Sequence, residues 1–180
     1  MPTLDPDAPP VARTMHPELA RAARLSPAPD LSDVPAVRRR LQLQARVVAS
    51  THGANPPPGL VVADREVVAE RPGGLPVPVR CYDPSPGSQH RPALLFVHGG
   101  GFVLGDLETE HSRCCELAVD TGMVVVSVGY RLAPEWPYPA AFEDCCAVMR
   151  WLADGSDLGV DPSRVGLVGI SAGGALVLGV

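Results

Sequence analysis

The sequence is poor in aromatic residues and has no long apolar run. Only 4% of its 180 residues are Phe, Trp or Tyr, although 46% are hydrophobic and the mean hydropathy is +0.10. This composition predicts a globular protein whose core is built mainly from aliphatic side chains. Because no stretch approaches the ~18 consecutive apolar residues of a membrane span, we expect no stable insertion into a membrane.

Positive charge is also scarce. The 15 Lys and Arg residues are outnumbered by 20 Asp and Glu residues, which gives a formal net charge of −5. This balance argues against nucleic acid as a partner, and we interpret the only basic run, Arg38-Arg39-Arg40, as a solvated helix face. The first residues lack the basic and apolar segments of a signal peptide, so a cytoplasmic location is expected.

The cysteines form no pattern typical of a disulfide framework or of a metal site. Their number is odd, no C-x-x-C spacing occurs, and two vicinal pairs fall in expected helices, where neighbouring side chains diverge. We interpret them as buried, inert thiols, and we expect no metal and no cofactor. The five are Cys81, Cys114, Cys115, Cys145 and Cys146.

Turn-forming residues and apolar segments divide the chain into two expected parts. Residues 1–55 contain two helical candidates and a proline-rich linker, and are expected to form a cap or extension. Residues 56–180 alternate strand-like and helix-like segments, which predicts βαβ units and a mostly parallel sheet with helices on both faces. Strands are expected near 60–70, 77–82, 93–97, 123–128 and 164–170, and helices near 109–121 and 140–153. The proline inside 77–82 predicts that this strand lies at a sheet edge.

A strand-turn-helix pattern with serine at its apex lies near the end of the chain. Ser171 is flanked by Gly169 and Gly173 in a Gly-x-Ser-x-Gly arrangement that follows an apolar run. This context is typical of the nucleophile elbow, where the serine occupies strained dihedral angles and side chains at the two glycine positions would collide with neighbouring backbone.

A second glycine-rich segment follows the buried strand expected at 93–97. It consists of His98, Gly99, Gly100 and Gly101. Consecutive glycines at the carboxyl end of a strand allow the backbone amides to face a developing negative charge, as in an oxyanion hole. A phosphate-binding loop would require Gly-Lys-Ser/Thr at its end, which this sequence does not have. We expect the side chain of His98 to hold the glycine-rich turn in place.

These two motifs, together with Tyr-Arg-Leu-Ala-Pro-Glu at 130–135, resemble the hormone-sensitive-lipase-like family of α/β-hydrolases. The resemblance covers about residues 55–180 and corresponds to the amino-terminal part of that fold. It implies hydrolysis of small carboxylic esters through an acyl-enzyme, with Ser171 as nucleophile. It also implies an oxyanion hole from the amides of Gly99, Gly100 and Ala172, with Gly101 shaping the loop.

Two departures from the family pattern limit this expectation. Ile170 stands where the family usually has Asp, and no acid or histidine follows Ser171. Because the triad order in α/β-hydrolases is serine, acid, histidine, we expect a fold truncated after the elbow strand, an exposed sheet edge, and little or no activity from this chain alone. None of the five upstream histidines is expected to act as the base.

Three alternatives remain open at this stage. The chain could be a non-catalytic ligand-binding member of the same fold, a degraded gene fragment, or a dinucleotide-binding half-domain. The last is disfavoured because Ser171 stands where the fingerprint requires glycine. A homo-oligomer is compatible with the composition.

The segment at 130–135 is interpreted as scaffold beneath the site. Arg131 and Glu135 are expected to pair with each other within this turn. Trp136, Tyr138 and Phe142 are interpreted as packing residues and not as part of an acyl pocket.

Overall fold

The computed structural model describes residues 16, 19, 30–51, 56–68, 74–154 and 156–180. Contacts group the chain into two units, Met1–Asp33 and Val34–Val180. In the first unit a short 3-10 helix, η2, spans Leu31–Asp33. The helix expected at 17–24 lies mostly outside the described residues. The second unit begins with helix α2 (Val34–Thr51). The expected domain division at residues 55 and 56 stays a prediction.

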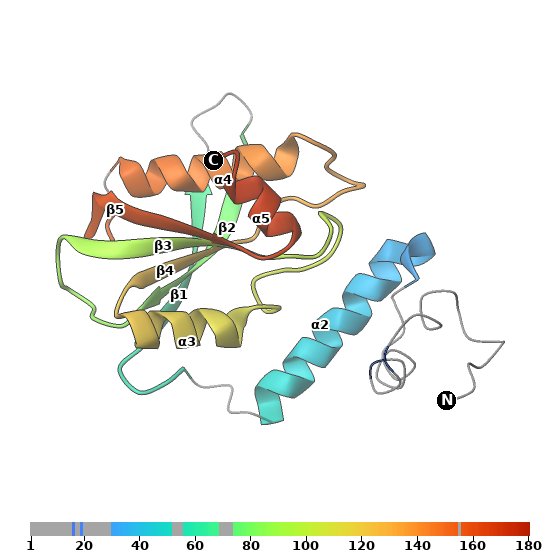
Figure 1. The fold of residues 1–180 in the computed structure, drawn as a ribbon, viewed down its shortest axis with the longest axis horizontal. Helices are drawn as coiled ribbons and strands as arrows, with labels where there is room; N and C mark the ends of the chain where they lie inside the picture. Colours follow the sequence, from blue (N-terminus) through green and yellow to red (C-terminus); the bar gives the residue numbers. More distant parts are fainter. Residues whose placement is uncertain (1–15, 17–18, 20–29, 52–55, 69–73, 155) are drawn as a thin grey trace. The chain divides into compact units, whose positions relative to one another are not determined.

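Five strands form one sheet in the order β1-β2-β4-β3-β5 (Figure 1). β2 pairs antiparallel with β1 and with β4, whereas β3 pairs parallel with β4 and with β5. Only β2 therefore runs against the other four strands, which confirms the predicted mostly parallel sheet. The strands span Val61–Val68 (β1), Pro76–Asp83 (β2), Arg91–Val97 (β3), Val124–Val128 (β4) and Val160–Gly169 (β5).

Helices cover both faces of this sheet. α3 (His111–Thr121) lies on one face, and α4 (Ala140–Ala153) and α5 (Ala172–Val177) lie on the other, as Figure 1 shows. The ends of α3 and α4 agree closely with the segments expected from the sequence. Within the described residues, none of the helices is both long and apolar enough to cross a bilayer.

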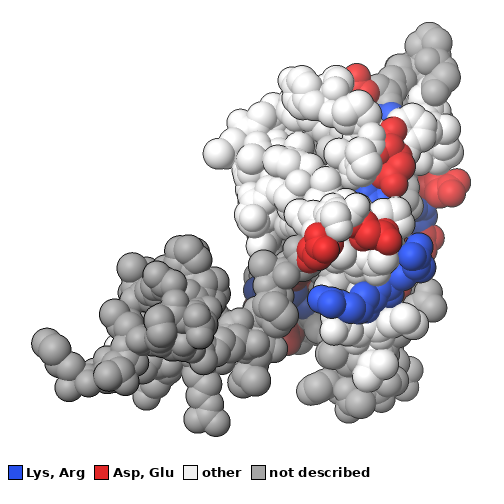
Figure 2. All heavy atoms as spheres, turned by 90° about the vertical axis from the view of Figure 1, so that its right-hand side faces the viewer, with Lys and Arg blue, Asp and Glu red and all other residues white. Residues whose placement is uncertain are grey.

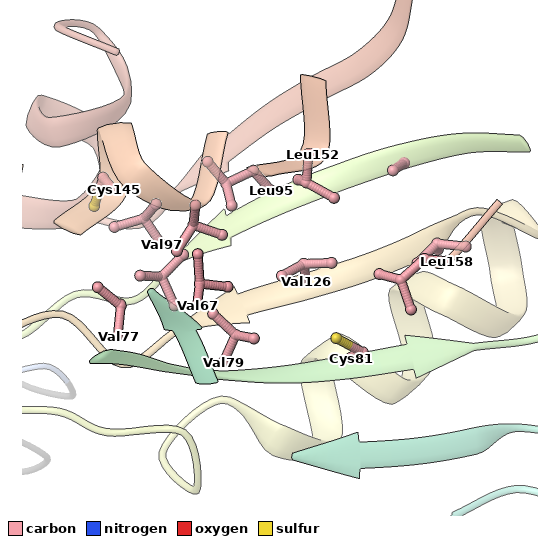
Figure 3. Close-up of a cluster of buried hydrophobic side chains, with 14 of the residues drawn as sticks. Val67, Val77, Val79, Cys81, Leu95, Val97, Val126, Cys145, Leu152 and Leu158 are labelled. Atoms are coloured by element: carbon pink, nitrogen blue, oxygen red, sulfur yellow. The ribbon is translucent and has the colours of Figure 1, made fainter. Parts of the chain in front are cut away.

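The core consists of two layers separated by the sheet. Alternate residues of a strand point to opposite faces, so Leu95 and Val126 contribute to the cluster under α4, whereas Phe96 and Val125 contribute to the cluster under α3. Figure 3 shows the first layer, in which Leu152 of α4 packs among strand side chains. β4 is buried over its whole length, as expected for a strand that is covered on both faces.

The expectation that the proline-containing strand lies at an edge is wrong. β2 has a partner on each side, β1 and β4. Pro78 is tolerated because it lies where pairing with β4 ends: Gly129 donates its amide to the carbonyl of Pro78 at 2.9 Å, and Pro78 has no amide to return the bond. The proline ends the β2–β4 ladder and does not interrupt it.

The cysteines lie inside the fold, as expected from their apolar surroundings. Four are buried and Cys146 is half-buried, and all five are free thiols. Burial raises the pKa of Cys81, Cys114 and Cys145 to about 12, so these thiols stay protonated and unreactive at neutral pH.

Charged side chains of both signs lie close together on the surface. Figure 2 shows Arg side chains beside Asp and Glu on the face that it presents, and a large part of the same face carries no charge. One arginine forms two such pairs: Arg80 of β2 donates to Asp64 of β1 at 2.6 Å and to Glu108, in the turn before α3, at 2.8 Å. This arrangement differs from the continuous basic surface typical of nucleic-acid-binding proteins.

Candidate active site

The elbow has the geometry that the serine motif predicts. β5 ends at Gly169, α5 begins at Ala172, and Ser171 lies between them with φ 51° and ψ −115°. A positive φ is unusual for a residue with a β-carbon and is a form of backbone strain found at functional sites. Ser171 is exposed, and among the described residues its hydroxyl has no hydrogen-bond partner.

Glycine is required on both sides of the elbow. A β-carbon at Gly169 would overlap the backbone of Gly173, and one at Gly173 would overlap the carbonyl oxygens of Val97 and His98. The predicted collisions at these two positions are therefore confirmed. The close approach of Gly173 places the first turn of α5 directly against the end of β3.

The glycine loop after β3 lies against the elbow. A β-carbon built on Gly99 would be 3.0 Å from the carbonyl oxygen of Ile170 and 3.5 Å from Cβ of Ser171. The amide of Ile170 donates to the carbonyl of Val97 at 3.1 Å, which extends the β3–β5 pairing into the two loops. Gly100 adopts φ 121°, and a side chain there would overlap the carbonyl of Leu104. Gly101, with φ 62°, also adopts a left-handed conformation.

Three amides near the serine are available as donors. Within the described part of the chain, the amides of Gly99 and Gly100 donate to no acceptor. Ala172 is the first residue of α5, and the first amides of a helix have no intrahelical acceptor. Free amides beside a nucleophile are the arrangement that can stabilise an oxyanion. The part that each of these residues plays in catalysis stays a prediction.

His98 is buried beneath the glycine loop. Its Nδ1 lies 2.7 Å from the carbonyl of Gly99, and its ring stacks on Tyr130 with a centroid distance of 4.1 Å. Burial lowers the pKa of His98, so the ring is neutral and Nδ1 is the nitrogen that donates to Gly99. Tyr130 in turn donates its hydroxyl to the carbonyl of His98 at 2.9 Å. The ring is thus arranged to hold the loop, not to accept the proton of Ser171.

None of the other described histidines contacts the serine. His16 and His90 are exposed, and Nδ1 of His111 lies 3.1 Å from the hydroxyl of Tyr82. His52 lies outside the described residues. Within the described ranges no group of three His, Cys, Asp or Glu residues could hold a metal ion.

The expected Arg131–Glu135 pair is not formed, and that prediction is wrong. Arg131 instead forms several hydrogen bonds with the buried carboxylate of Asp144, the shortest 2.7 Å long. Glu135 pairs with Arg38 of α2. Arg131 and Glu135 thus bind partners on different helices, because the turn directs the two side chains to different elements.

The aromatic residues after this segment do not all pack in the core. Phe142 packs against the core cluster under α4, as expected. Trp136 is 45% exposed and Tyr138 is 88% exposed, so interpreting these two as packing residues was wrong. The guanidinium of Arg131 lies 5.4 Å from the centre of the Trp136 ring and covers part of it.

The sequence interpretation missed two residues that support the site: Asp144, which holds Arg131, and Arg38, which donates to the carbonyl of Val103 beside the glycine loop. Tyr130, which holds His98, belongs to the segment that was interpreted as scaffold. An acidic residue on the apolar face of the expected helix at 140–153 was the signal available for Asp144. No comparable signal identified Arg38 within its basic run.

The carboxyl-terminal half of the chain matches a family model. The model is described as an alpha/beta hydrolase fold, and it matches residues 94–180. This segment begins inside β3 and includes both the glycine loop and the elbow.

Several curated proteins are similar in sequence. Lipase 2 of Moraxella is 47% identical over 117 residues, which cover 62% of this chain and 27% of the relative. Esterase LipI of Mycobacterium tuberculosis is 46% identical over 122 residues, which cover 66% of this chain and 37% of the relative. The matched segment therefore spans well under half of each of these relatives.

Solved structures of esterases share the fold. Esterase LipW from Mycobacterium marinum superposes with a TM-score of 0.79 at 38% identity, covering 95% of this chain and 53% of that one. A bacterial heroin esterase gives a TM-score of 0.78 at 33% identity, covering 94% of this chain and 52% of that one. This chain thus spans about half the length of these structures. It has the α/β-hydrolase fold, and the expected resemblance to the hormone-sensitive-lipase-like family is confirmed.

Proposed function

We propose that the chain carries the nucleophile and the oxyanion hole of a carboxylic-ester hydrolase. The observation that supports this most directly is the contact between Gly99 and the Ile170–Ser171 turn, with free amides next to an exposed, strained serine. The names of the similar proteins, among them lipase, esterase and carboxylesterase, agree with this reaction.

In the proposed reaction, Oγ of Ser171 attacks the ester carbonyl carbon and gives its proton to a base. The carbonyl oxygen becomes an oxyanion that accepts hydrogen bonds from the amides of Gly99, Gly100 and Ala172. Collapse of the intermediate expels the alcohol, which takes up the proton and leaves an acyl-serine. Water then attacks the acyl-serine and releases the acid. Losing one donor from such a hole typically costs about 3–4 kcal/mol of barrier.

The base is the missing component of this proposal. His98 is held by Gly99 and Tyr130, and no other described histidine contacts Ser171. A serine without a base is a weak nucleophile, and only residual catalysis from the oxyanion hole and from binding then remains. We therefore propose that full activity requires an acid and a histidine in addition to the groups that the described residues place at Ser171.

A matched assay tests the proposal. Turnover of a short-chain p-nitrophenyl ester by the 180-residue chain is expected to differ little from that of Ser171→Ala. When the chain is part of a product that also supplies an acid and a histidine, Ser171→Ala should reduce kcat by a factor on the order of 10⁶. Strong turnover by the 180-residue chain that Ser171→Ala abolishes would contradict the missing base. Unchanged turnover in the longer Ser171→Ala product would contradict the nucleophile.

A second candidate, which the sequence left open, is a non-catalytic ligand-binding protein of the same fold. A product that binds esters without hydrolysing them would support it. A small ester as substrate, a cytoplasmic location, the absence of nucleic-acid binding and assembly into a homo-oligomer all stay proposals.

A further inference from the structure

Arg38 differs from the two arginines that follow it in α2. Its side chain is only 21% exposed, whereas Arg39 and Arg40 are exposed. The expectation that the whole basic run forms a solvated helix face is therefore wrong for Arg38. A guanidinium that leaves water needs hydrogen-bond acceptors to replace it.

The guanidinium of Arg38 forms four hydrogen bonds with two segments. Nε donates to the carbonyl of Val103 at 2.8 Å, and Nη2 donates to the carbonyl of Ala133 at 2.7 Å. Nη1 and Nη2 also hold the two carboxylate oxygens of Glu135 at 2.9 and 3.0 Å. This pairing lowers the pKa of Glu135. Such planar, two-pronged recognition is specific to arginine and is not available to lysine.

Val103 belongs to the turn that closes the glycine loop. The amides of Val103 and Leu104 both donate to the carbonyl of Gly100, at 3.1 and 2.9 Å. Phe102, with φ 65°, accepts a bond from the amide of Ala133 at 2.9 Å. Because the carbonyl of Gly100 is fixed by this turn, the direction of the peptide groups in the glycine loop depends on the position of Val103.

Helix α2 also borders the space behind the loop. Arg38, Leu41 and Gln42 line a cavity of about 460 Å³, and its other walls include His98 and Tyr130. His98 and Tyr130, which hold the glycine loop, therefore line the same cavity as helix α2.

We propose that Arg38 is a positioning residue for the glycine loop. By tying α2 to the carbonyls of Val103 and Ala133, it keeps the turn after Gly100 in the shape in which the Gly99 and Gly100 amides lie beside Ser171. The effect on catalysis rests on the proposed function, whereas the effect on the loop does not.

Residue-resolved hydrogen exchange tests the effect on the loop. In Arg38→Gln, the amides of Val103, Leu104 and Ala133 should exchange about ten- to a hundredfold faster, the range expected when hydrogen bonds to a charged group are lost. The core amide of Val126 should keep its rate. Arg39→Gln and Arg40→Gln are matched controls in the same helix and should leave all of these rates unchanged.

Two further variants separate the backbone contacts from the ion pair. Glu135→Gln keeps the donors to Val103 and Ala133, so it should accelerate loop exchange less than Arg38→Gln does. Arg38→Lys keeps the charge but lacks the planar fork, so it should resemble Arg38→Gln. Equal acceleration in Glu135→Gln and Arg38→Gln would overturn the proposal, as would wild-type rates in Arg38→Gln or a uniform acceleration that includes Val126.

The effect of Arg38 on catalysis is measured as kcat and KM in a form of the protein that hydrolyses esters. There Arg38→Gln should lower kcat about tenfold or more while KM changes little, because oxyanion contacts form only in the transition state. A change confined to KM would overturn the catalytic part. If Ser171→Ala leaves turnover unchanged, the proposed function fails, and the exchange rates still decide whether Arg38 positions the loop.

Discussion

The two halves of the candidate site stand on strands with very different support. The glycine loop follows β3, which is paired on both sides, whereas the serine turn follows β5, which is paired only with β3 and forms one edge of the sheet described here. Leu95 of β3 and Leu167 of β5 are register partners, yet Leu95 is fully buried and Leu167 is 38% exposed. The same residue type thus occupies a core position on one strand and a surface position on the next.

This contrast also extends to the loops. The glycine loop is held by His98 and Tyr130 from beneath and by Arg38 through Val103. The serine turn is held mainly by backbone contact with the end of β3 and by the packing of Gly173 against it. The oxyanion half of the site is therefore held by side-chain hydrogen bonds from several elements, whereas the nucleophile half depends on backbone contact with β3 and on the packing of Ile170 against the cluster under α3.

The largest expected effect is the difference in unfolding free energy between alanine variants of Leu95 and Leu167. Leu95→Ala should lower the free energy of unfolding by about 2–5 kcal/mol, because it removes a fully buried side chain and leaves a cavity. Leu167→Ala should cost roughly 1 kcal/mol or less, because its side chain is already partly hydrated. Chemical denaturation of both variants measures the difference. Equal losses would mean that β5 is as well covered as β3, which would contradict the contrast.

A pair of neighbouring glycines tests the elbow in the same way. Gly173→Ala places a β-carbon in the backbone of Val97 and His98, so it should cost roughly 1–3 kcal/mol of stability and displace the serine turn. Gly174→Ala meets nothing closer than 3.4 Å and should be neutral or stabilising by up to about 1 kcal/mol, since alanine favours the helix. Thermal unfolding compares them. A Gly173→Ala variant as stable as wild type would show that the packing of α5 on β3 is loose.

The support beneath the glycine loop should make stability depend on pH. Burial lowers the pKa of His98 in the folded state, although the hydrogen bond to the Gly99 carbonyl and, to a lesser extent, nearby Asp106 and Glu110 oppose this. Because the unfolded chain binds the proton more readily, the contribution of His98 is complete above its unfolded pKa near 6.5 and is lost as the pH falls below it. The slope is at most about 1.4 kcal/mol per pH unit for one proton.

Denaturation between pH 7 and pH 5 measures this effect. Stability should fall over this interval, with a further contribution of the same sign from His111, whose pKa is lowered by burial and by Arg80. His98→Asn should make the fall shallower. An identical slope in His98→Asn and wild type would contradict the buried neutral ring.

The sequence predicted the elements and the motif residues well, because both depend on short-range patterns. The apolar run before His98 and the glycines around Ser171 report local backbone requirements, and the structure has the strand and the turn at those places. The alternation of strands and helices likewise sufficed for a mostly parallel sheet.

Most of the failed predictions concern partners that are far away in the sequence. Arg131 and Glu135 are near neighbours in the chain but bind Asp144 and Arg38 respectively. Pro78 suggested an edge because the sequence does not reveal where β4 stops pairing. Trp136 and Tyr138 suggested a core because aromatic residues are usually buried, whereas here their loop faces solvent.

Pro78 has no part in the proposed reaction, yet it lies at the point where β4 stops pairing with β2. Since Pro78 cannot return a bond to Gly129, β4 is released from the sheet one residue before Tyr130. The freed segment then crosses to the end of β3, where the hydroxyl of Tyr130 reaches the carbonyl of His98. The support beneath the glycine loop therefore begins at the point where the β2–β4 ladder ends.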